Sequence, residues 1–174
     1  MTIKTIVIVI LGALAVFAQV TVAPRFPLWA AVPAFPLVFL VLLAAFGGPF
    51  KAMVATPIVA IALGFASNRA PGLLLLAYLP ALPIGLLLEE SDIPLSHLVR
   101  TLTSGIATGV WIRLLLASTV LAQAGFTISL FTKVIVPGIF LDFALLAVVY
   151  LVLSLIGLNG RSLTLPRGGF LAHE

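Results

Sequence analysis

Long, uninterrupted apolar runs constrain the fold of this chain more than any other feature. A helix needs about 20 mostly apolar residues to cross a bilayer, and several of these runs approach or exceed that length. Hydrophobic residues make up 63% of the sequence and charged residues only 8%, whereas soluble domains carry about 25% charged residues. Membrane barrels show alternating apolar and polar residues. The continuous runs therefore predict an all-α membrane protein.

The runs divide into six expected helices joined by short loops. Their approximate ranges are 3–22, 28–46, 50–65, 72–88, 97–123 and 128–158. Prolines inside the second, third, fourth and sixth ranges predict kinked or irregular turns, because proline cannot donate the usual backbone hydrogen bond. We expect residues 1–158 to form the six-helix transmembrane domain and residues 159–174 to form a polar cytoplasmic tail.

The first apolar run also resembles a signal peptide, because Lys4 precedes it and Thr21-Val22-Ala23 is similar to a cleavage site. Pro24 follows directly, and the run is long enough to span the membrane. We therefore interpret it as a retained first helix.

Six spans place both termini on the same side of the membrane, and the basic residues favour one orientation. With the termini inside, the inner side holds Lys4, Lys51, Arg100, Arg161 and Arg167, and the outer side holds Arg25, Arg69 and Lys133. Lys and Arg are enriched on the cytoplasmic side of membrane proteins. The sequence thus predicts a multi-pass protein of the inner (cytoplasmic) membrane with both termini cytoplasmic.

Arg113 and Asp142 are charged residues inside apolar spans. A charge near the middle of the bilayer costs at least about 2.5 kcal/mol, so such residues usually face the bundle interior and pair. The two residues lie at similar distances along the chain from the turn near Gly125, which places them at about the same depth in an antiparallel hairpin. We predict an intramembrane ion pair or shared polar site. Three roles are possible for this polar pair: a packing clamp, a ligand or ion site, or a contact with a partner's membrane helix.

Small residues repeat every four positions along the fifth expected helix. Gly105-x-x-x-Gly109 is a close-approach motif of membrane helices. The repeat predicts tight packing against a helix of the same chain or against a partner. Its members, apart from Arg113, are Thr101, Gly105, Gly109 and Ala117.

The remaining polar residues give little sign of chemistry. Glu89, Glu90 and Asp92 form the acidic segment between the fourth and fifth expected helices, either a cytoplasmic docking loop or a solvated one. The chain has no cysteine, and its two histidines form no ligand motif. Its Lys and Arg residues form no cluster of the nucleic-acid-binding kind. We expect no enzymatic activity and no bound cofactor, metal or nucleic acid. We expect membrane lipids to surround the protein.

Several stretches resemble the MreD family of rod-shape-determining membrane proteins. The second expected helix opens at a proline and continues into apolar residues 36–43, and residues 64–78 pass from a polar turn through a glycine into a leucine-rich helix. Asn68 stands where the family commonly has an acid. Pro137 and Asp142 match the proline and polar residue of its last helix, although the family often has asparagine there.

The resemblance implies a non-catalytic membrane scaffold of the bacterial cell-elongation machinery. MreD-like proteins dock the bitopic protein MreC and help to couple MreB filaments to RodA and a class-B penicillin-binding protein, which build peptidoglycan. The family is also similar in fold to the substrate-binding subunits of energy-coupling-factor transporters for vitamins or metals. Such a subunit is the alternative function, and an accessory subunit of another membrane complex is a third.

Overall fold

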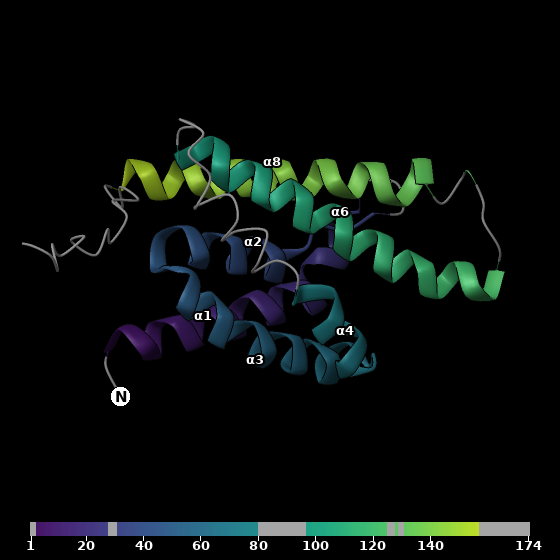
Figure 1. Cartoon of the computed structure of the whole chain (residues 1–174), viewed down its shortest axis with the longest axis horizontal. Coiled ribbons are helices and arrows are strands. Elements are labelled where there is room, and N and C mark those ends of the chain that lie inside the picture. The colour runs from purple at the N-terminus through teal and green to yellow at the C-terminus, as the bar shows by residue number, and fades with distance from the viewer. Residues whose placement is uncertain (1–2, 28–30, 80–96, 125–127, 129–130, 157–174) are drawn as a thin grey trace, which may run out of the picture.

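The computed structural model of the chain describes residues 3–27, 31–79, 97–124, 128 and 131–156. Every regular element in this part is helical, which confirms the prediction of an all-α membrane protein (Figure 1). The elements are α1 (Ile3–Thr21), the 3-10 turn η1 (Ala23–Arg25), α2 (Phe35–Leu42), the π-helical turn η2 (Leu43–Gly47), α3 (Pro49–Ser67), α4 (Pro71–Tyr78), α6 (His97–Ala124), the π-helical turn η3 (Phe131–Ile135) and α8 (Val136–Leu155).

Four helical stretches in the described residues are long and apolar enough to cross a membrane. They are Thr5–Arg25, Pro49–Ser67, His97–Thr119 and Phe131–Leu155, with lengths of 21, 19, 23 and 25 residues. At a rise of about 1.5 Å per residue, each matches a hydrocarbon core about 30 Å thick. The chain is therefore embedded in a membrane. The acidic segment Glu89, Glu90 and Asp92 and the tail 159–174 lie outside the described residues.

The second helix begins later than the sequence predicts. We expected it from residue 28, but residues 31–34 are not helical and α2 starts at Phe35. Pro33 disfavours the helical conformation at the residue before it, whereas Pro36 lies in the first turn of α2, where its missing N–H costs nothing. At its other end, α2 continues into the π-helical turn η2.

The third helix ends two residues later than predicted, at Ser67. Asn68 follows in the left-handed conformation, with φ 52° and ψ 35°, and ends the helix. Asparagine tolerates this conformation better than most residues, so it suits a helix C-terminus. Pro71 then starts α4, whose backbone comes close to Gly64 of α3.

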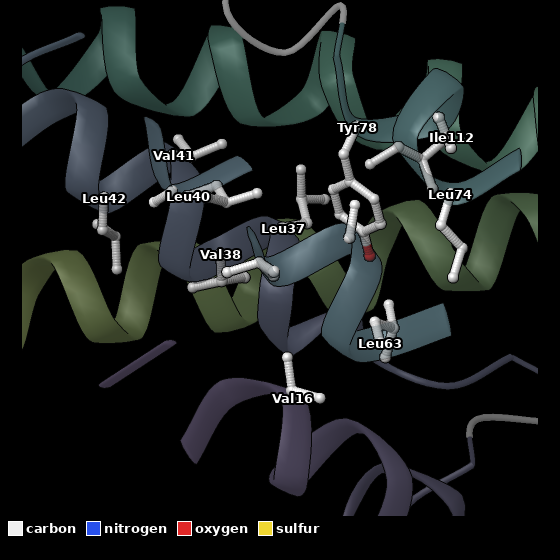
Figure 2. Packing of buried hydrophobic residues seen from close by; sticks show 14 of the residues in the cluster. Val16, Leu37, Val38, Leu40, Val41, Leu42, Leu63, Leu74, Tyr78 and Ile112 are labelled. Carbon is white, nitrogen blue, oxygen red and sulfur yellow. The ribbon is translucent and has the colours of Figure 1, made fainter. Parts of the chain in front are cut away.

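The short helix α2 forms the centre of the bundle. It lies between α1 and α3 on one side and α6 and α8 on the other (Figure 1). Its apolar side chains face all directions, which is typical of a helix surrounded by others. Figure 2 shows several of them beside residues of α1, α3, α4 and α6. Its buried residues are Pro36, Leu37, Val38, Leu40, Val41 and Leu42.

The outer helices present apolar side chains to the surroundings. On α1, Leu14 is 56% exposed and Phe17 is 65% exposed, whereas Val16 of the same helix is buried at 7%. Gly12 lets α1 approach Phe39 and Val59. In water such surfaces would be unfavourable, but a lipid bilayer solvates them. The exposed apolar faces are thus the lipid-facing side of the bundle.

Candidate functional site

Arg113 of α6 and Asp142 of α8 form an ion pair inside the bundle. Nη2 and Nε of Arg113 both donate to Oδ2 of Asp142, at 2.7 and 2.9 Å. The two side chains are only 12% and 5% exposed. The structure therefore brings together the two charges that the sequence placed at the same depth, and each removes the cost of leaving the other unpaired.

The ion pair also binds the backbone of the non-helical segment before α2. Nη2 of Arg113 donates to the carbonyl of Val32 at 3.0 Å, and the N–H of Ala34 donates to Oδ1 of Asp142 at 2.7 Å. Gln19 of α1 accepts a hydrogen bond from the N–H of Phe35 at 2.9 Å. Inside a membrane, backbone groups must be hydrogen-bonded within the protein, because lipid offers them no partner. The pair thus satisfies peptide groups that the proline-interrupted helix leaves open.

Gly138 makes room for this arrangement. It lies one turn before Asp142 on the same face of α8. A Cβ atom at Gly138 would overlap the guanidinium group of Arg113, against which this glycine packs. Gly138 provides the space for the arginine and Asp142 provides the countercharge, so two positions of one helix face hold the same side chain.

The small-residue stripe of α6 packs against helices of the same chain. Thr101, Gly105, Gly109 and Ala117 are all buried. A Cβ atom at Gly105 would overlap Leu146 of α8 and would lie near Val41 of α2. At Gly109 it would lie 3.4 Å from Leu37 and 3.7 Å from Asp142. The stripe is therefore an internal helix-packing face, the first of the two options left open by the sequence.

A second polar cluster connects α6 and α8 at the opposite end of α2. Nδ1 of His97 is hydrogen-bonded to the hydroxyl of Tyr150 at 2.9 Å, and Nε2 lies 3.2 Å from the carbonyl oxygen of Ala45 in η2. The ring of Phe46 contacts both His97 and Tyr150. Donation from Nε2 to Ala45 and from Tyr150 to Nδ1 satisfies all three groups. At each end of α2, the irregular backbone is therefore held by a polar pair that consists of one residue of α6 and one residue of α8.

A cavity of about 670 Å³ lies beside the ion pair. It is bounded by the C-terminal ends of α1 and α3, by the segment before α2, by α4, by the second half of α6, by η3 and by Asp142 of α8. Arg113, Asp142, Tyr78 and Arg69 line it. Arg69 is exposed, so the cavity reaches the surface of the protein.

Several members of this site were not predicted from the sequence. Gln19, Gly138 and Tyr78 were not singled out as site residues, and His97 was dismissed for lack of a ligand motif. Gly138 carried a usable signal, because a glycine one helical turn from an intramembrane charge indicates space for its partner. In the described residues, no three metal-ligating side chains come together.

Comparisons with known proteins assign no role to this arrangement. The chain matches none of the protein-family models, curated proteins or solved structures with which it was compared. Its function must therefore be inferred from the site and from the sequence resemblance.

Proposed function

We propose that the chain is a non-catalytic integral membrane scaffold of the bacterial cell-elongation machinery. In this proposal it crosses the inner membrane six times, keeps both termini in the cytoplasm and docks an MreC-like bitopic protein. Through that protein it helps to couple MreB filaments to RodA and a class-B penicillin-binding protein. The proposal rests on the resemblance of residues 36–43 and 64–78 to the MreD family.

One structural observation supports a scaffold. The intramembrane charges Arg113 and Asp142 bind each other and the chain's own backbone at Val32 and Ala34. His97 and Tyr150 do the same at Ala45. Polar groups used in this way make helix positions unique and rigid. A rigid bundle with apolar outer faces suits a protein that positions the membrane helix of a partner.

Co-purification tests the proposal directly. We expect the chain, purified from its native membrane in mild detergent, to carry an MreC-like protein that mass spectrometry identifies, with or without RodA and its transpeptidase. Depletion should also make a rod-shaped host round. Recovery of an ATPase module in place of these proteins would contradict the scaffold and support the transporter-subunit alternative.

Photo-crosslinking would locate the docked helix. A photoreactive residue is placed at one exposed apolar position at a time, so that each variant samples the lipid-facing side of one helix. Suitable positions are Leu14 on α1, Ile58 on α3 and Val148 on α8. We expect one of these sides to cross-link to the single-pass partner. Val16 is the matched control, because it lies on α1 but is buried. Equal cross-linking from every side, or from none, would contradict docking of a helix at a defined face.

A further inference from the structure

The cavity beside the ion pair has the composition of a ligand site. Its volume of about 670 Å³ lies within the range of about 300 to 1,000 Å³ that is usual for small-molecule pockets. Its walls are mostly apolar and include Leu63, Leu74 and Ile112. Such pockets typically combine apolar walls with a few polar groups that orient the ligand.

Tyr78 supplies a hydroxyl group to this cavity. The residue is 3% exposed and lines the cavity. Its hydroxyl is not among the fully buried atoms that lack a partner in the described residues, so it is accessible from the cavity. Figure 2 shows the hydroxyl oxygen at the end of the Tyr78 ring that lies nearer to Leu63 and Leu74. The hydroxyl can therefore donate a hydrogen bond to a group inside the cavity.

Charged groups around this hydroxyl favour an anion. Arg69, Arg113 and Asp142 all line the cavity and interact electrostatically with Tyr78. Asp142 balances one of the two guanidinium groups, which leaves one positive charge. Nε and Nη2 of Arg113 bind Asp142, whereas Nη1 makes no hydrogen bond to the described residues. The site therefore combines donors on Tyr78, Arg113 and Arg69 with a net charge that a monoanion would neutralise.

We propose that this cavity binds a small amphipathic monoanion. Its carboxylate or phosphodiester group lies among the Tyr78 hydroxyl, Nη1 of Arg113 and the guanidinium of Arg69, and its apolar body lies against Leu63, Leu74 and Ile112. The anionic group can come from a membrane lipid or from a soluble organic acid. Binding would occur whether or not the chain acts as a scaffold, so the purified full-length chain is sufficient for the test.

The experiment compares anionic probes with probes of the same apolar size that carry no net charge. The full chain in a non-ionic detergent is titrated with dihexanoyl phosphatidylglycerol or dihexanoyl phosphatidylcholine, and separately with 4-phenylbutyrate or 4-phenylbutanol. Binding is measured by isothermal titration calorimetry and by the thermal unfolding midpoint. We expect at least one anionic probe to bind and to raise the midpoint more than its partner without net charge. A response to the lipid alone identifies a lipid headgroup, and a response to 4-phenylbutyrate alone identifies a soluble acid.

Two variants tie binding to the named groups. Tyr78→Phe removes only the hydroxyl, and Arg69→Gln removes an exposed charge. A hydrogen bond to a charged group is worth about 1.5 kcal/mol or more, so each variant should weaken binding about tenfold. Lys51→Gln is the matched control, because Lys51 is exposed and lies in the first turn of α3, at the end away from the cavity. The affinity of this variant should be unchanged.

The folded state provides a check on Tyr78→Phe. Without ligand this variant should be about as stable as the wild type, because the hydroxyl that it removes is accessible from the cavity and makes no hydrogen bond to the described residues. Equal binding of the anionic probes and of their partners without net charge, or wild-type affinity in both Tyr78→Phe and Arg69→Gln, would overturn the proposal. So would the absence of binding by all four probes.

Discussion

The guanidinium group of Arg113 occupies the space that a side chain at Gly138 would fill. Asp142, one turn further along the same helix face, binds that guanidinium. The relationship explains how an arginine fits in the interior of a tightly packed membrane bundle. It also means that the ion pair depends on Gly138, a residue without a side chain.

Gly138→Ala should therefore destabilise the protein. The added methyl group would displace the guanidinium of Arg113 from Asp142 and from the carbonyl of Val32, and overpacking alone costs about 1–3 kcal/mol. The free energy of unfolding can be measured by SDS titration in mixed micelles. Gly72→Ala is the control, because nothing lies near a Cβ atom at that position of α4, and it should be neutral or slightly stabilising. Equal stability of the two variants would contradict the close packing at Gly138.

Single replacements in the ion pair should be costly and coupled. Asp142→Leu leaves Arg113 buried without its countercharge, and Arg113→Leu leaves Asp142 in the same state, at about 3–5 kcal/mol each. The double variant should recover part of the loss, because it leaves no unpaired charge. A double-mutant cycle on thermal stability measures the coupling. If the double variant is no better than the worse single variant, the two charges do not act as a pair.

The two glycines of Gly105-x-x-x-Gly109 should respond differently to alanine. A Cβ atom at Gly105 would overlap Leu146, whereas one at Gly109 would lie at an ordinary 3.4 Å from Leu37. Gly105→Ala should destabilise by about 1–3 kcal/mol, and Gly109→Ala should be close to neutral. Adding Leu146→Ala to Gly105→Ala should relieve the overlap. Similar effects at both glycines would indicate a symmetric helix contact, which the structure does not have.

Tyr150→Phe should weaken the second polar cluster. The change leaves Nδ1 of His97 without the hydroxyl at 2.9 Å and should cost about 1 kcal/mol. Tyr78→Phe is the matched control in the same thermal assay, because the Tyr78 hydroxyl makes no hydrogen bond in the described part of the chain. A Tyr150→Phe variant as stable as Tyr78→Phe would show that the His97–Tyr150 bond contributes nothing.

Much of the fold follows from local sequence. Apolar run length predicts the helices, and the positions of Arg113 and Asp142 relative to one turn predict their common depth. The start of α2 at Phe35 was not predicted, because the cost of interrupting the helix at Pro33 depends on which side chains bind the backbone groups that the interruption frees. Asp142 and Gln19 receive them, from 108 and 16 residues away in sequence.

The second polar cluster could not be predicted for the same reason. His97 is bound to Tyr150 and to the carbonyl of Ala45, and that carbonyl lies in a π-helical turn. No spacing in the sequence connects these three residues. The helix that packs against the small-residue stripe could not be predicted either. The stripe indicates that a helix packs closely, but it does not indicate whether that helix belongs to the same chain.

Arg113 and Asp142 hold the backbone of Val32 and Ala34 in addition to binding each other. Two uncharged double variants test the contact with Ala34: Arg113→Gln with Asp142→Asn keeps an amide oxygen that can accept from the N–H of Ala34, whereas Arg113→Leu with Asp142→Leu keeps no polar group. A backbone group left unpaired should cost about 1–3 kcal/mol. In SDS titration we predict that the Gln/Asn variant is more stable than the Leu/Leu variant by about 1–3 kcal/mol. Equal or greater stability of the Leu/Leu variant would contradict the claim.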